Sequence, residues 1–214
     1  MPTILDEIVE AKRKEVALQK EAVSVADLEG HITSRATPEN FSSALRGRGV
    51  QLISEVKKAS PSRGLLCPDF DPVRLARTYS SNGAAAISVL TDLRFQGELD
   101  HLSQIKQSGA SQRLPVLRKD FIFDPYQVYE ARAVGADALL LIVAILTPQL
   151  LSELLALTQK LWMQCLRQDR WCFTTKRWCM GPGPIMRIIR EWGSPSTMWR
   201  PTCVRQGSRD HLPC

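Results

Sequence analysis

Two short segments carry ionisable side chains in arrangements that suit acid–base chemistry. The first is S-E-V-K-K at 54–58, in which Glu55 and Lys57 stand two residues apart. If Ile53 faces the covering helices, strand alternation sends Glu55 and Lys57 to one side, about 7 Å apart along the strand. A carboxylate and an ammonium that close alter each other's proton affinity, as general acid–base catalysis requires. An ion pair on a surface loop is the alternative, and the spacing leaves both open.

The second segment is L-R-K-D-F at 117–121, where three consecutive ionisable residues follow an apolar run. Strand geometry lets only one of Arg118 and Lys119 face inward. A lysine that is partly desolvated near other cations can donate a proton at neutral pH. A solvated charge cluster at the end of a strand is the alternative.

A third segment, S-P-S-R-G at 60–64, offers hydroxyls, backbone N–H groups and a guanidinium. Groups of this kind bind anions such as phosphate. A plain polar turn fits the same residues, so the segment is a candidate anion site and no more.

The elements that must position these groups alternate regularly along the chain. Apolar residues at helical spacing predict an amphipathic helix over 4–20, and a second short segment covers 25–32. Four apolar runs then alternate with four helices. The runs are 52–56, 86–90, 114–117 and 138–142, and the helices are 73–81, 99–107, 125–134 and 147–161.

This alternation is typical of parallel strands that are buried on both faces. It predicts an α/β protein with either an open doubly wound sheet or a closed barrel. Ionisable residues lie at the C-terminal ends of the first and third strands. Barrel enzymes place their active sites at these ends, so this placement favours the barrel. Open sheets also bind ligands at strand ends, so the placement supports the barrel without proving it.

Composition divides the chain in two. The 214 residues are 44% hydrophobic, which suits one soluble globular core. No apolar run is long enough to cross a membrane and the N-terminus lacks a secretory pattern, so we expect a cytoplasmic protein without a membrane partner. The net charge of +6 arises after residue 160, because basic and acidic residues are equal in number before it. All five tryptophans and all but one of the six cysteines also follow residue 160.

Several motifs together resemble the indole-3-glycerol phosphate synthase family. They are S-E-V-K-K-A-S-P-S-R-G at 54–64, G-A-A-A-I-S-V-L-T-D at 83–92, L-R-K-D-F at 117–121 and G-A-D-A-L-L-L-I at 135–142. Their order and approximate spacing match the family, and I-L-D-E-I-V-E-A-K-R at 4–13 resembles its additional N-terminal helix. The resemblance implies TIM (β/α)8-barrel lineage, with an N-terminal helical extension at 1–50 and the first four βα units at 51–166.

The resemblance also implies roles for individual residues. Lys119 matches the family's general acid, and Glu55 and Lys57 match its catalytic pair on the first strand. Ser60 matches a serine that contacts the substrate phosphate. The positions of Phe121 and Leu141 line the pocket for the aromatic ring.

The implied protein is a carboxy-lyase of tryptophan biosynthesis. It closes a ring in carboxyphenylamino-deoxyribulose 5-phosphate and expels carbon dioxide and water, giving indole glycerol phosphate. The reaction requires no metal and no cofactor. The implied partner is this small phosphorylated substrate, and no nucleic acid is expected.

The resemblance ends near residue 166. The family continues with a strand reading roughly V-E-V-H-D-E, whose first glutamate is the general base, and with later strands that complete the phosphate site. Residues 167–214 show none of these motifs. We therefore expect little or no synthase activity from the chain as written. A shifted reading frame near codon 166 accounts for the lost motifs and the altered composition together.

Other interpretations of this basic tail rich in cysteine and tryptophan are disorder, metal binding, disulfides and nucleic-acid binding. Cys165, Cys172 and Cys179 recur every seven residues, whereas zinc sites favour pairs two to four residues apart. Disulfides would require an oxidising compartment. Interleaved arginines and tryptophans could stack on single-stranded nucleic acid. The alternatives to a lyase are thus an inactive truncated relative and a binding module with a basic tail.

Overall fold

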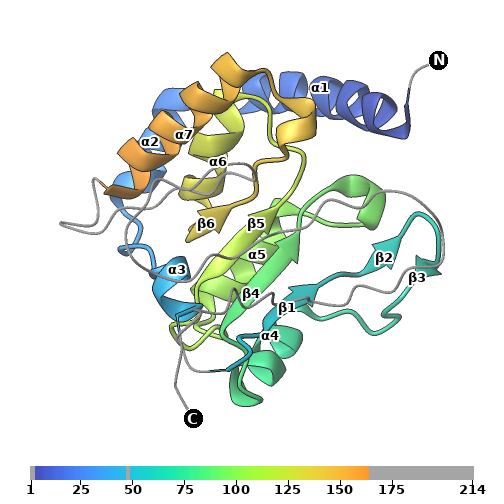
Figure 1. Cartoon of the computed structure of the whole chain (residues 1–214), viewed down its shortest axis with the longest axis vertical. Coiled ribbons are helices and arrows are strands. Elements are labelled where there is room, and N and C mark those ends of the chain that lie inside the picture. The colour runs from blue at the N-terminus through green and yellow to red at the C-terminus, as the bar shows by residue number, and fades with distance from the viewer. Residues whose placement is uncertain (1–2, 47–48, 164–214) are drawn as a thin grey trace, which may run out of the picture. The chain divides into compact units, whose positions relative to one another are not determined.

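The computed structural model describes residues 3–46 and 49–163 (Figure 1). All the described residues belong to one compact unit of the chain. Our expectations for residues 167–214, disorder and a shifted reading frame among them, lie outside the described residues.

The N-terminal segment is helical, as predicted. Helix α1 spans Ile4–Ala22 and α2 spans Val25–Thr33. Each begins with a reciprocal capping box, Thr3 with Asp6 and Ser24 with Asp27, which satisfies backbone N–H groups that a helix leaves free at its start. A short helix, α3, spans Phe41–Ala44.

The sheet contains four parallel strands in the order β1-β4-β5-β6, which is also their order along the chain (Figure 1). A doubly wound sheet reverses its strand order, whereas a barrel adds each strand beside the last. The order therefore matches the first half of a barrel and confirms the α/β fold with four βα units. The strands are β1 (Ile53–Val56), β4 (Ala86–Leu90), β5 (Val116–Lys119) and β6 (Ala138–Leu139).

A helix follows each of these strands. These helices are α4 (Pro72–Ser81), α5 (Leu99–Gln107), α6 (Pro125–Ala133) and α7 (Pro148–Met163). The connections contain two single-turn 3-10 helices, η1 (Leu93–Phe95) and η2 (Val143–Ile145), and an antiparallel hairpin of β2 (Ala59–Ser60) and β3 (Gly64–Leu65). No helix in the described part of the chain is long and apolar enough to span a bilayer.

Two strands differ from their predicted bounds by more than one residue. Strand β5 begins at Val116 rather than Leu114 and continues through Lys119, because Arg118 and Lys119 pair with the last residues of β4. Strand β6 ends at Leu139, although the apolar run continues to Ile142. Hydrophobicity marks burial, and the hydrogen-bonding partner decides where a strand begins and ends.

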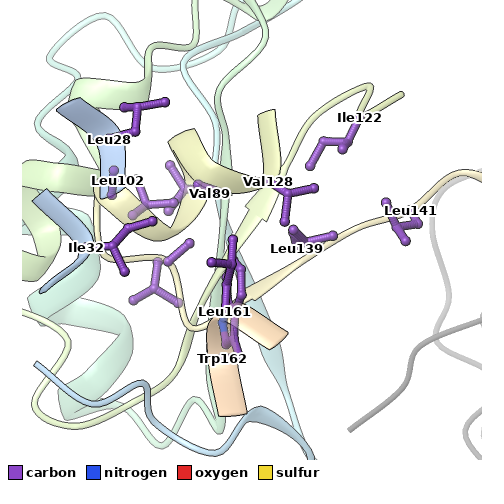
Figure 2. Packing of buried hydrophobic residues seen from close by; sticks show 14 of the residues in the cluster. Leu28, Ile32, Val89, Leu102, Ile122, Val128, Leu139, Leu141, Leu161 and Trp162 are labelled. Carbon is purple, nitrogen blue, oxygen red and sulfur yellow. The ribbon is translucent and has the colours of Figure 1, made fainter. Parts of the chain in front are cut away.

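The core lies mainly between the sheet and its helices. Figure 2 shows part of this cluster, with Leu161 and Trp162 from α7 and Leu139 from β6. A smaller cluster on the opposite face joins the starts of the strands to Phe41 of α3, and Ile53 packs against it. The condition that Ile53 faces the covering helices is therefore not met, since Ile53 shares the opposite face with Glu55.

Candidate active site

Glu55 and Lys119 meet across the sheet although their strands are not neighbours. Strand β4 lies between them, with Glu55 in register with Ser88 and Lys119 with Leu90. The Lys119 ammonium donates a hydrogen bond to Glu55 Oε1 and forms an ion pair with it. The two side chains are 32% and 33% exposed, so a ligand on this face could reach both charges. Arg118 points the other way and is 1% exposed, which confirms that only one of the two basic residues faces inward.

Lys57 lies just beyond β1 and contacts an aromatic ring that the sequence did not single out. Its Nζ is 5.2 Å from the ring centroid of Phe95 in η1, within the range of a cation–π interaction. The backbone carbonyl of Glu55 accepts a hydrogen bond of 3.2 Å from the Tyr79 hydroxyl of α4. Glu55 is thus bonded through its carboxylate to β5 and through its backbone to α4.

The candidate anion segment forms the β2–β3 hairpin. The hydroxyl oxygens of Ser60 and Ser62 lie 3.2 Å apart, and Ser62 and Arg63 are exposed. The backbone N–H of Arg63 closes the turn by donating to the Ser60 carbonyl at 3.2 Å. The hairpin presents both hydroxyls and the guanidinium at the surface, so the anion site and the polar turn both remain compatible with it.

Phe121 and Leu141 are both buried, at 6% and 5% exposed. The backbone of Phe121 is held on both sides, because its N–H donates to Asp120 Oδ1 at 2.8 Å and its carbonyl accepts from Gln127 Nε2 at 3.0 Å. Leu141 belongs to the larger core cluster together with Leu139 (Figure 2). Their contact with a substrate ring stays a prediction.

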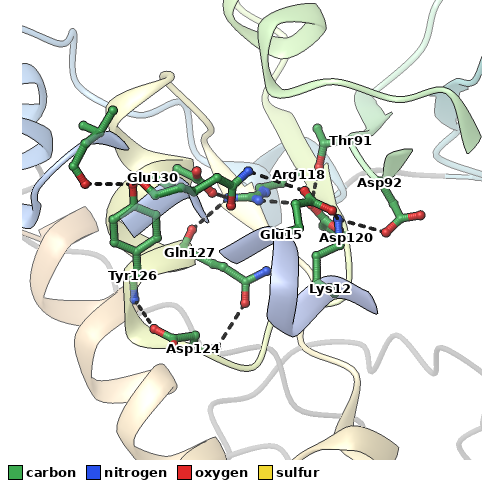
Figure 3. Close-up of polar contacts among 12 residues, drawn as sticks. Lys12, Glu15, Thr91, Asp92, Arg118, Asp120, Asp124, Tyr126, Gln127 and Glu130 are labelled. Carbon is green, nitrogen blue, oxygen red and sulfur yellow. Dashed lines mark hydrogen bonds and ion pairs between the residues drawn. The ribbon is translucent and has the colours of Figure 1, made fainter. Parts of the chain in front are cut away.

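A group of buried charges lies at the ends of β4 and β5 (Figure 3). Lys12 from α1 contacts Asp92 at 2.9 Å and Asp120 at 3.1 Å, and Glu15 at 2.8 Å. Burial alone lowers the pKa of Lys12, but the carboxylates of Asp120 and Asp92 outweigh it and raise that pKa. We call Lys12, Asp92 and Asp120 the strand-end charge cluster.

Arg118 extends this group toward α6. Its guanidinium contacts Asp120 and Glu130 at 3.0 Å each and donates to the Gln127 carbonyl at 2.9 Å. Burial would raise the pKa of Asp120, but the charges of Arg118 and Lys12 outweigh it and lower that pKa. For Glu130 burial dominates and raises the pKa despite Arg118.

The sequence contained signals for Lys12 and Asp92, which the sequence analysis did not single out. Lys12 occupies a helical stripe between Ile8 and Val16, and all three are buried. A lysine at such a spacing requires a buried acidic partner. Asp92, one such partner, lies within a motif that carried the family resemblance. No group of three or more possible metal-ligating side chains occurs among the residues described.

The fold and the site together are those of half a (β/α) barrel, whose ionisable groups lie at the strand ends where barrel enzymes carry out their chemistry. The sequence model of the family described as indole-3-glycerol phosphate synthase matches residues 5–168. The chain belongs to this family.

The individual relatives that match this chain carry the name of the family. An indole-3-glycerol phosphate synthase of Roseiflexus sp. (strain RS-1) is 55% identical over 171 residues, which cover 78% of this chain and 64% of the relative. One from Dehalococcoides mccartyi (strain ATCC BAA-2100 / JCM 16839 / KCTC 5957 / BAV1) is 52% identical over 165 residues, 76% of this chain and 64% of the relative. One from Mycolicibacterium gilvum (strain PYR-GCK) is 48% identical, with 77% of this chain and 60% of the relative covered. The chain thus spans less than two thirds of the length of these relatives.

Proposed function

We propose that the chain carries the general-acid half of an indole-3-glycerol phosphate synthase site, acting on carboxyphenylamino-deoxyribulose 5-phosphate. The observation that carries the proposal is the accessible ion pair of Lys119 and Glu55, which spans β4 within a family match that includes both residues. The proposal also divides the chain into a helical extension at 1–50 and half a barrel at 51–166.

In the proposed reaction, the ring carbon that bears the carboxylate attacks the carbonyl carbon of the sugar chain. A carbon–carbon bond forms, and the carbonyl oxygen takes a proton from the Lys119 ammonium and becomes a hydroxyl. The carbon–carboxylate bond then breaks, carbon dioxide leaves, and its electron pair neutralises the iminium nitrogen. Loss of the hydroxyl with one further proton, as water, completes the indole.

The remaining site residues have supporting roles in this proposal. Glu55 holds the Lys119 ammonium and is a candidate to receive a proton during dehydration. Lys57 stabilises the carboxylate of the intermediate, because a cation beside an existing negative charge lowers its energy. Ser60 contacts the phosphate, and Phe121 lines the pocket for the aromatic ring, as does Leu141.

The test is steady-state formation of indole glycerol phosphate by the purified chain, followed by its fluorescence, together with calorimetric titration of the substrate. Lys119→Ala should abolish turnover while substrate binding falls less than about tenfold, because the lost proton donor acts mainly in the transition state. Lys14→Met is the matched control, since Lys14 is 77% exposed on α1. Measurable turnover that is equal in the wild-type and Lys119→Ala chains would refute the role of Lys119.

The second candidate is an inactive relative, and the loss of the family motifs after residue 166 favours it. It predicts substrate binding without turnover. Adding a polypeptide with the second half of the Roseiflexus relative separates the two candidates. If the described half is competent, turnover should appear with this supplement and disappear again in Lys119→Ala.

A further inference from the structure

Helix α1 carries a buried ammonium group that the proposed chemistry does not use. Lys12 is 2% exposed and lies on the stripe of α1 that faces the protein, between Ile8 and Val16. Its Nζ reaches Asp92, two residues beyond β4, and Asp120, the residue directly after β5 (Figure 3). One side chain from the N-terminal helix therefore joins the ends of two neighbouring strands.

The Asp120 carboxylate is held by four donors. Oδ1 accepts from the Phe121 N–H at 2.8 Å and lies 3.1 Å from Lys12. Oδ2 accepts from the Thr91 hydroxyl at 2.7 Å and from Arg118 at 3.0 Å. Because Asp120 lies between Lys119 and Phe121 in the chain, these contacts fix the backbone from which the Lys119 side chain extends.

Asp92 holds the turn on which Phe95 lies. Its Oδ1 accepts from the Arg94 N–H at 3.0 Å, and its carbonyl accepts from the N–H groups of Phe95 and Gly97 at 3.0 Å each. Phe95 is the ring that Lys57 contacts. Lys12 is thus connected to two lysines of the candidate site. It reaches the backbone beside Lys119 through Asp120, and the ring that Lys57 contacts through Asp92.

A purely stabilising role explains this lysine poorly. Removing an ammonium and two carboxylates from water costs free energy that their attraction barely repays, and an apolar side chain often packs as well or better. The neighbouring stripe positions, Ile8 and Val16, are apolar. The charge of Lys12 therefore contributes more by fixing one arrangement of Asp92 and Asp120 than by raising the free energy of unfolding.

We propose that Lys12 is a positioning residue, whose ammonium joins Asp92 to Asp120 and thereby holds Lys119 in its pairing geometry with Glu55. The catalytic consequence rests on the proposed function, whereas the effect on Lys119 does not. The N-terminal helix is then part of the site's construction.

The test measures how fast individual lysines of the folded full chain react with a limiting amine-acetylating ester, by peptide mass spectrometry. Lys119 in Lys12→Met should react about fivefold faster than in the wild type, the factor that corresponds to about 1 kcal/mol of lost pairing. Lys106 is the internal reference, because it pairs with Asp137 at 2.7 Å and is 21% exposed. Its rate should not change.

Three further variants sharpen the test. Lys14→Met should leave Lys119 unchanged, because Lys14 lies on the exposed face of the same helix. Lys12→Arg keeps the charge and should restore the wild-type rate at least in part. Glu55→Gln removes the carboxylate that pairs with Lys119 and sets the scale of the increase. If circular dichroism shows that Lys12→Met does not fold, Asp92→Asn takes its place, with the same expected increase.

An unchanged Lys119 rate overturns the proposal, as does an equal increase at Lys106, which indicates general loosening. Where the chain turns over substrate, Lys12→Met should lower kcat about tenfold and change KM less than about threefold. Wild-type turnover in Lys119→Ala would instead defeat the proposed function, and the acetylation rates would still decide the role of Lys12.

Discussion

Arg118 is the side chain whose removal should destabilise the described fold most clearly. It is 1% exposed and holds Asp120, Glu130 and the Gln127 carbonyl at 2.9 to 3.0 Å. Arg118→Met keeps most of the aliphatic stem and removes the charge. Breaking a buried ion pair by removing one partner costs about 3–5 kcal/mol, because the other partner stays charged without compensation. A domain of this kind is stable by about 5–15 kcal/mol, so the loss should be large.

The pH dependence of this loss tests whether the uncompensated charge of Glu130 causes it. Burial already raises the pKa of Glu130, and Arg118 is the group that opposes the increase. Without Arg118 the pKa of Glu130 should rise further, so the folded variant takes up a proton as the pH falls. Because protonation removes the uncompensated charge, the loss should be larger at about pH 8 than at about pH 5.5.

Urea denaturation followed by far-ultraviolet circular dichroism at both pH values provides the measurement. The double variant Arg118→Met/Glu130→Gln should recover about half of the loss at the higher pH, because it removes the Glu130 charge, whereas the Asp120 carboxylate keeps Lys12, Thr91 and the Phe121 N–H. Arg77→Met is the control, since Arg77 is exposed on α4. A loss under about 1 kcal/mol at the higher pH would refute the reasoning. So would equal losses at both pH values.

Three other predictions follow from single contacts. Gly97→Ala should lower the free energy of unfolding in urea by about 1–3 kcal/mol, because a Cβ there would lie 2.3 Å from the Leu90 carbonyl oxygen. An unchanged free energy of unfolding would show that the loop moves to accept the Cβ. Burial lowers the pKa of His101 from 6.5, so the unfolded chain takes up the proton first and stability should decline as the pH falls below about 6.5. His101→Gln should flatten that decline and the exposed His31→Gln should not; the opposite pattern would contradict the assignment. Tyr126→Phe removes a hydroxyl that donates to two carbonyls at the end of α1, at 2.9 and 3.1 Å, and should cost about 1 kcal/mol and speed amide exchange there, whereas unchanged exchange would argue against this anchor.

The sequence predicted the βα alternation because parallel strands covered by helices need nearly continuous apolar runs, and such runs can be recognised from the sequence alone. It predicted strand ends less well. Leu114 is apolar yet precedes β5, while Arg118 and Lys119 are charged yet complete it, because pairing with β4 decides the strand. It also left the face of Ile53 open, since a short strand with mixed residues does not reveal which side the helices cover.

What the sequence determined by itself is the family, the order of the elements and the candidacy of Glu55 and Lys119, which residue type and local spacing express. Tertiary structure alone brought these two together, because the chain between them forms β4 and its helix and returns on the far side of β4. It also carried Lys12 from the N-terminal helix to the ends of β4 and β5. Such contacts depend on how the strands register and how the helix docks. Those relations act between segments far apart in sequence, and only the folded chain fixes them.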